Sequence, residues 1–334
     1  MKRSQILTAI FCLVLGAFVP THAQRNLTRA AIWEPKLNGP VPGEIQILPV
    51  QGNVHVLIGA GANITVQSSE EGILLVDTGT ADMSDKVLKA IASISNRPLR
   101  YIVNTTGSLD HTGGNEKIAA TGEIIPYREP DYTAGPQGAL DTHRAKVISF
   151  LTVFQRMAEQ NPPRPDGAWP DDTFSSPQKR IFFNNEPVLI MHMPGNTDGN
   201  SIVLFRKSDV VSTGDLLDLT QYPIINLQAG GSINAIIDSL DRIIDITVPS
   251  SNAAGGTLVI PGRGRISDHA EVVYYRDMIT IIRDRIQDMI KRGMTLEQVQ
   301  AARPTRDYDA RYGNPTGLWN TEKFVEAAYR SLSK

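Results

Sequence analysis

The chain has 334 residues, of which 41% are apolar and 20% are charged, and its formal net charge is −2. This balance is typical of a globular protein with a sizeable core and excludes a disordered or fibrous chain. The basic residues are scattered and the net charge is close to zero, so we expect no nucleic acid as a partner.

The first 23 residues have the parts of a secretory signal. Two basic residues at positions 2 and 3 precede a largely apolar run at 6–19, and the segment ends in the small residue Ala23. The run is too short for a membrane span, which needs about 20 residues. We therefore expect export to the periplasm or the medium, cleavage after Ala23, and a mature chain that does not bind membranes. The single cysteine, Cys12, lies in this segment, so the mature protein would have no disulfide.

A first group of strands is predicted by short apolar runs that alternate with turns rich in glycine and asparagine. These strands are expected at 45–50, 54–58, 64–67, 73–76 and 99–103, after a lead-in over 24–44. A helix is expected at 84–95, because apolar residues recur there at spacings of three and four.

A second group follows in the same manner. We expect strands at 181–183, 188–191, 202–205, 210–212 and 257–260, helices at 140–160, 232–246 and 269–292, and a proline- and aspartate-rich loop at 161–177. Two runs of strands, each with helices after it, predict two packed sheets with helices outside. We expect a single domain over 45–334 that includes the C-terminal helices.

The most informative segment is residues 104–115, which reads Asn-Thr-Thr-Gly-Ser-Leu-Asp-His-Thr-Gly-Gly-Asn. It resembles the metal-binding loop of the metallo-β-lactamase superfamily, whose pattern is N-T-H-x-H-x-D-H-x-G-G-N. Asp110 and His111 stand at two ligand positions of that pattern. Thr106 and Ser108 replace its first two histidines.

Four further local patterns support the resemblance, which covers roughly 45–263. Asp77 lies in a V-D-T-G sequence, where the family has a residue that supports the metal loop without binding the metal. Asn196 replaces a histidine of P-G-H-T-x-G, and Asp215 matches the carboxylate that bridges two metals. Arg263 replaces the histidine of a terminal P-G-H-G pattern. The resemblance implies an α/β fold, the four-layer αββα sandwich.

The same resemblance implies a hydrolytic zinc site, in which the metal lowers the pKa of a bound water towards about 7. The retained residues Asp110, His111 and Asp215 would bind zinc or another divalent metal, at most one per chain, and Asp110 would be the catalytic residue of an active enzyme. The replaced ligand positions are Thr106, Ser108, Asn196 and Arg263. Hydroxyl and amide groups are weak zinc donors, and a guanidinium has no free lone pair.

Arg263 suggests a different use of the site. Asp110 and Asp215 would lie close together in this fold, and two adjacent carboxylates repel each other unless a cation or a proton lies between them. A guanidinium can supply that charge by pairing with one or both carboxylates. Our hypothesis is that Arg263 replaces the charge of the metal and holds the loops in place.

The other histidines give little support for a shifted metal site. His55 alternates with apolar residues in a strand, His143 lies in the region expected to be helical, and His269 begins a helix, so we expect structural or surface roles for all three. His192 precedes Asn196 by four residues. It is the best candidate for a shifted ligand, or for a residue that supports the site from behind.

The sequence leaves two functions open. One is an exported hydrolase with a remodelled single-metal site, acting on a small-molecule lactam, thioester, lactone or phosphoester. The other is a non-catalytic pseudoenzyme that keeps the fold and a ligand cleft, bordered by the 161–177 loop with Trp169. The intact Asp110 and His111 favour an occupied site, whereas Arg263 beside them opposes the binding of a cation.

Overall fold

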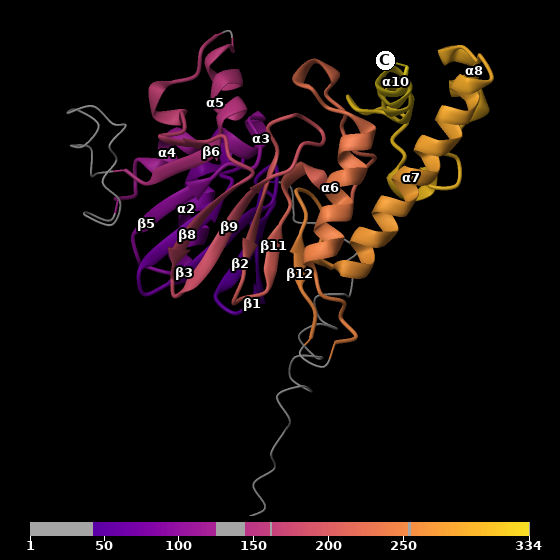
Figure 1. Ribbon diagram of the computed structural model, residues 1–334. Helices are drawn as coiled ribbons and strands as arrows, with labels where there is room; N and C mark the ends of the chain where they lie inside the picture. The colour runs from indigo at the N-terminus through magenta and orange to yellow at the C-terminus, as the bar shows by residue number, and fades with distance from the viewer. Residues whose placement is uncertain (1–42, 125–143, 161, 253–254, 334) are drawn as a thin grey trace, which may run out of the picture. The chain divides into compact units, whose positions relative to one another are not determined.

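The protein is described by a computed structural model that covers residues 43–124, 144–160, 162–252 and 255–333. Two β-sheets pack face to face in these ranges, and helices cover their outer faces (Figure 1). This arrangement confirms the expected α/β fold and its αββα layers. The expected signal segment with its cleavage site after Ala23, most of the 24–44 lead-in, and His143 lie outside the described residues.

The first sheet has its strands side by side in chain order. They are β1 (Gln46–Gln51), β2 (Val54–Ile58), β3 (Ile64–Ser69), β4 (Gly72–Val76), β5 (Leu99–Val103), β6 (Lys146–Phe150) and β7 (Asp172–Phe174). Pairing is antiparallel from β1 to β4 and parallel from β4 to β7. The carboxyl ends of the parallel strands therefore meet at one edge, where α/β proteins commonly build their sites.

The second sheet has the order β13-β12-β11-β10-β9-β8. Its strands are β8 (Gln178–Phe183), β9 (Glu186–His192), β10 (Ser201–Phe205), β11 (Val210–Ser212), β12 (Leu258–Ile260) and β13 (Ser267–Asp268). The β8–β9 hairpin turns through Asn184 and Asn185, whose φ angles are 53° and 61°. Asparagine adopts this left-handed conformation more readily than most residues, and two-residue hairpin turns require it.

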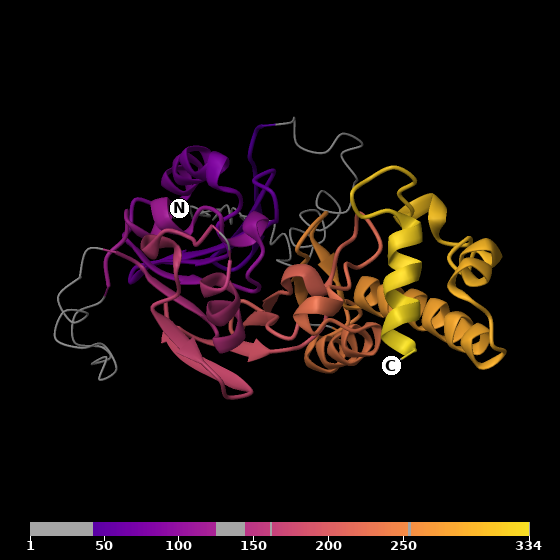
Figure 2. The same cartoon turned by 90° about the horizontal axis from the view of Figure 1, so that it is seen from above.

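Helices close both faces of the sandwich. The first sheet is covered by α2 (Ser84–Ile94) and α4 (Asn115–Ala119), which bury apolar residues against it. The second sheet is covered by α6 (Ile233–Ile246) and α7 (His269–Lys291). Outside them, α10 (Thr321–Leu332) packs against α6 and α7, and α8 (Leu296–Ala302) packs against α10; the four helices gather on one side of the molecule in Figure 2. The short helices are α3 (Leu109–Thr112), α5 (Leu151–Ala158) and α9 (Asp309–Tyr312). None of the helices in the described ranges is long and apolar enough to span a membrane.

A buried carboxylate ties the two sheets together. Glu186, 1% exposed, accepts hydrogen bonds from Gln67 Nε2 of the first sheet at 2.8 Å and from the Ser208 hydroxyl at 2.8 Å. It also accepts from the backbone N–H groups of Lys207 and Ser208, each at 3.0 Å. Because four donors surround it, the carboxylate is satisfied without a cation, and it fixes how one sheet lies on the other.

The prediction of a helix over 140–160 was wrong for its middle part. Residues 146–150 form β6, between β5 and β7, and of the described part of this range, 144–160, only 151–158 are helical. The apolar spacing of Val147 and Leu151 fits a helix, but Val147, Ile148 and Phe150 belong to a buried parallel strand, for which continuous apolar runs are typical. The 161–177 loop likewise contains a strand, β7.

Candidate functional site

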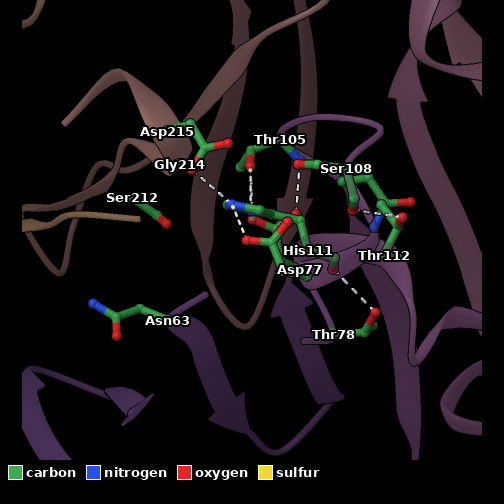
Figure 3. A network of polar contacts seen from close by, with 12 residues as sticks. Asn63, Asp77, Thr78, Thr105, Ser108, His111, Thr112, Ser212, Gly214 and Asp215 are labelled. Carbon is green, nitrogen blue, oxygen red and sulfur yellow. Dashed lines mark hydrogen bonds and ion pairs between the residues drawn. The ribbon is translucent and has the colours of Figure 1, made fainter. Parts of the chain in front are cut away.

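Loops from both sheets meet at one edge of the sandwich and bring together the residues expected from the sequence. Asp77 follows β4, and the 104–112 segment with α3 follows β5. On the second sheet, Asn196 lies between β9 and β10, Asp215 lies in the turn after β11, and Arg263 follows β12. Ion pairs and hydrogen bonds link these loops, and Figure 3 shows the part of the site around Asp77, His111 and Asp215.

Asp77 anchors the loop that follows β5. Its carboxylate is 1% exposed and accepts from Thr105 N at 2.8 Å, from Thr105 Oγ1 at 2.6 Å, and from His111 Nδ1 at 2.7 Å. Its backbone has a φ of 64°, a conformation that non-glycine residues seldom adopt. Such strain persists only where surrounding contacts impose it, and here it points the carboxylate at the loop.

His111 is fully buried between two carboxylates. Its Nδ1 contacts Asp77 and its Nε2 lies 2.9 Å from Asp215 Oδ1 (Figure 3). Burial by itself would lower the pKa of His111, but the charges of Asp215 and Asp77 outweigh it and hold the pKa well above its ordinary value. The ring is therefore an imidazolium at neutral pH, and both of its nitrogens donate.

Arg263 spans the two carboxylates at the mouth of the site. Its Nη1 lies 3.1 Å from Asp215 Oδ1, and its Nη2 is ion-paired with Asp110 Oδ2. Asn196 Nδ2 donates to the other oxygen of Asp215 at 3.2 Å. Burial would raise the pKa of Asp215, but His111 and the Asn196 amide hold it below its ordinary value. We call the chain of charges Asp77–His111–Asp215–Arg263–Asp110 the ion network.

The ion network does not fit a zinc ion. Both nitrogens of His111 are engaged, and Asp215 Oδ1 already faces His111 Nε2 and Arg263 Nη1. Within the described ranges, no three His, Cys, Asp or Glu side chains are arranged to hold a metal. The donors that a metal would need are thus committed to cations that the chain itself supplies.

A cleft of about 240 Å³ opens beside the ion network. Six positions singled out from the sequence line it: Thr106, Ser108, Asp110, Asn196, Asp215 and Arg263. Val153 and Ile224 contribute apolar wall. Trp169 is not among the lining residues; it packs edge-on against Phe154, with 5.6 Å between ring centroids.

Of the other described histidines, His192 and His269 have partners outside the ion network. His192 Nε2 lies 2.6 Å from the Asp198 carbonyl, and its ring stacks on Phe150 with centroids 3.5 Å apart. His269 Nδ1 lies 2.9 Å from the Thr247 hydroxyl. His55 lies in β2, where partial burial lowers its pKa.

Two arginines contribute to the site although no sequence pattern singled them out. Arg164 is 8% exposed and donates to Thr112 Oγ1 at 2.6 Å and to the Gly107 carbonyl at 2.9 Å, so it holds the loop of His111 from behind. Arg156 lines the cleft and pairs through both terminal nitrogens with Asp198, at 2.7 and 2.6 Å. Neither stands at a fixed spacing from its partners, so the sequence carried no signal for these contacts.

Asp218, close behind Arg263, makes stability depend on pH. Burial raises its pKa to about 6, against hydrogen bonds from Thr220 that lower it, and Asp215 raises it further. The folded state therefore binds a proton that the unfolded state has lost, and stability falls as pH rises from about 4 to 6, by roughly 3 kcal/mol. Urea unfolding of wild type and Asp218→Asn should show this fall as the difference between the two curves, because the other titrating groups are common to both. An equal slope in both would contradict the assignment.

Comparisons with solved structures support the fold. The sec-alkylsulfatase Pisa1 from Pseudomonas sp. is 14% identical, with a TM-score of 0.65 over 86% of this chain, and this chain covers 50% of that protein. The metallo-β-lactamase from Pontibacter korlensis is 16% identical, with a TM-score of 0.54 over 71% of this chain and 99% of its own. DIM-1 metallo-β-lactamase is 16% identical, with a TM-score of 0.51 over 71% of this chain and 97% of its own.

These identities are low, so the structural likeness shows the fold alone. The chain spans about half the length of the alkylsulfatase. The comparison with curated proteins finds no match. The family model described as the metallo-beta-lactamase superfamily matches residues 57–246, more than half of the chain. Together with the αββα fold, this match establishes that the chain belongs to the metallo-β-lactamase superfamily.

Proposed function

We propose that this protein is a ligand-binding member of the superfamily that works without a metal, with Arg263 in place of the metal charge. One observation carries the proposal: the Arg263 guanidinium contacts both Asp110 and Asp215. These are the retained acidic positions at which the family resemblance implies metal ligands. A cation bound there would meet a guanidinium that is already paired, at a close distance and in a partly buried site.

The chemistry of the replaced positions supports the same proposal. Thr106, Ser108 and Asn196 present hydroxyl and amide groups, which bind zinc poorly but suit hydrogen bonds to an organic ligand. The cleft beside them is lined by polar groups and by apolar side chains such as Val153 and Ile224. Ligand sites combine these two features.

The second candidate is a hydrolase with one remodelled metal site built from Asp110, His111 and Asp215. Family membership favours it, and the hydrolase-like fold is present. It would require Arg263 to leave Asp215, and His111 to give up a proton that two carboxylates stabilise. Both changes cost free energy, so we rank this candidate second.

Metal content separates the two candidates. The mature chain, from Gln24 onward, is purified without chelator and dialysed against zinc or manganese, and metal is measured by mass spectrometry. We expect substoichiometric metal in the wild type and in the charge-matched control Arg263→Lys. Arg263→His, which offers an imidazole beside Asp110 and Asp215, should bind one zinc. One tightly held metal in the wild type, lost in Asp110→Ala, would refute the proposal and support the hydrolase.

We further propose that the protein is exported and binds a small molecule, with no nucleic acid or membrane as partner. The support is the signal-like start of the sequence and the near-neutral charge. Expression with the natural N-terminus, fractionation of the cells and N-terminal sequencing test the export. A mature chain outside the cytoplasm that begins at Gln24 is expected, and an intact cytoplasmic chain that begins at Met1 would contradict it.

A further inference from the structure

The charges around the cleft are already balanced. Among the described residues that line it, four are charged: Asp110, Arg156, Asp215 and Arg263. Asp110 and Asp215 pair with Arg263, and Arg156 pairs with Asp198. A charged ligand would lose its hydration without gaining a free partner of opposite sign, which is unfavourable.

Arg164 is a charged side chain close to the cleft. In the part of the chain that the structure describes, all of its hydrogen bonds go to neutral acceptors. Its three nitrogens donate to Gln160 Oε1, to Thr112 Oγ1 and to the Gly107 carbonyl. It lies behind the loop and is not among the residues that line the cleft. Burial lowers the pKa of Arg164. If the positive charge of Arg164 acted on the cleft, an anionic ligand would bind more tightly than a neutral one.

Three polar atoms of the cleft residues lack a hydrogen-bond partner within the described ranges, and one of them, Asp110 Oδ2, is instead ion-paired with Arg263. Asn196 is 4% exposed; its Nδ2 donates to Asp215, which identifies Oδ1 as the acceptor atom, and within the described ranges Oδ1 has no partner. The hydroxyl of Ser108 is likewise buried and unpartnered there. Buried polar atoms without a partner are uncommon in folded proteins, and each calls for an explanation.

A ligand in the cleft would offer these groups the partners that they lack. An amide carbonyl oxygen such as Asn196 Oδ1 can only accept, so the ligand must offer an N–H or O–H to it, whereas the Ser108 hydroxyl can accept or donate. The apolar wall of Val153 and Ile224 would cover the remaining part of the molecule. The cleft of about 240 Å³ limits that molecule to a small one.

We infer that the cleft binds a small uncharged molecule that donates an N–H or O–H hydrogen bond to Asn196 Oδ1 and lays an apolar face against Val153 and Ile224. This inference rests on the proposed function, since it takes the ion network as the permanent occupant of the metal position. It adds the chemical class of the ligand: an amide or an alcohol with an apolar body.

Four molecules of nearly equal shape test the class. Benzamide is neutral with an N–H donor, acetophenone is neutral without a donor, benzoate is an anion and benzamidinium is a cation. Binding to the full mature chain is measured by ligand-observed and protein-observed NMR. We expect benzamide to bind about tenfold more tightly than each of the other three. Acetophenone lacks the hydrogen-bond donor, and benzoate and benzamidinium each carry a charge without a partner; either difference is expected to change the affinity by about this factor.

Asn196→Ala should reduce benzamide to the affinity of acetophenone, and Ser108→Ala should weaken benzamide by a smaller factor. The second variant keeps the test decisive if the first does not fold. Asn96→Ala, at an exposed asparagine outside the cleft, is the matched control and should leave the ranking unchanged.

A preference for benzoate or benzamidinium, or a ranking unchanged in Asn196→Ala, would overturn the inference. So would the absence of benzamide binding. Metal analysis of the same samples distinguishes this failure from that of the proposed function. If the protein contains no metal but prefers benzoate, the inferred class of ligand is wrong, whereas the role proposed for Arg263 is not contradicted.

Discussion

Replacement of Arg263 by alanine should lower the free energy of unfolding at neutral pH by about 3 kcal/mol. The variant leaves Asp110 and Asp215 close together without their shared cation, and Asp215 is only 8% exposed. One of the two carboxylates must then take up a proton or move into water. Urea-induced unfolding, followed by circular dichroism, gives the difference directly.

Arg292→Ala is the matched control for this experiment. Arg292 pairs with Asp288, but the two side chains are 69% and 53% exposed, so we expect a loss below about 1 kcal/mol. Arg263→Lys keeps a charge that cannot fork to two carboxylates, and its stability should fall between wild type and Arg263→Ala. Since Asp215 no longer needs a cation once it is protonated, the effect of Arg263→Ala should shrink as pH falls through the pKa of Asp215, which lies below its ordinary value. An Arg263→Ala protein as stable as the control at neutral pH would rule out the role assigned to the guanidinium.

The second large effect is expected for Asp77→Ala, at about 4 kcal/mol. The change removes one of the two carboxylates that hold the buried His111 imidazolium, and it leaves the N–H and hydroxyl of Thr105 without their acceptor. Alanine at a φ of 64° adds backbone strain. Asp77→Asn keeps an acceptor for Thr105 and tolerates that backbone, so it should lose less.

Asp209→Ala separates the ion network from the backbone strain. Asp209 also has a positive φ, 53°, but it accepts one side-chain hydrogen bond, from Thr257, and has no part in the ion network. We expect a loss of about 1–2 kcal/mol for this control. Equal losses for Asp77→Ala and Asp209→Ala would show that His111 gains little from Asp77.

The stability of wild type and that of Asp77→Ala should depend differently on pH. Because the folded pKa of His111 is raised, its contribution to stability is full below the ordinary histidine pKa and is lost as pH rises through the folded value. Without Asp77 that folded pKa is lower, so stability should begin to fall at a lower pH in Asp77→Ala than in wild type. Urea unfolding between about pH 6 and 10 measures both curves.

The sequence predicted those parts of the site that depend on strand ends. Asp77, His111 and Asp215 each follow a strand with a clear apolar pattern, and the fold brings these ends together at one edge of the sandwich. The pairing of Arg263 with Asp110 and Asp215, stated as a hypothesis from the sequence, has the expected contacts.

Other parts could not be predicted because they depend on distant contacts. Arg164 reaches Thr112 across 52 positions, and no local pattern relates the two residues. β6 has an apolar spacing that suits a helix as well as a buried strand, and only its place between β5 and β7 decides the matter. That Asn196 Oδ1 has no partner among the described residues becomes visible only when its neighbours are known.

A charge that belongs to the chain cannot dissociate from it. A bound metal stabilises a fold by mass action, to an extent set by its free concentration and by competing chelators. The guanidinium of Arg263 is present at a fixed stoichiometry in every folded molecule, and unfolding separates it from Asp215 without releasing an ion to the solvent. With such a cation, the midpoint of unfolding should be the same whether zinc is abundant or withheld.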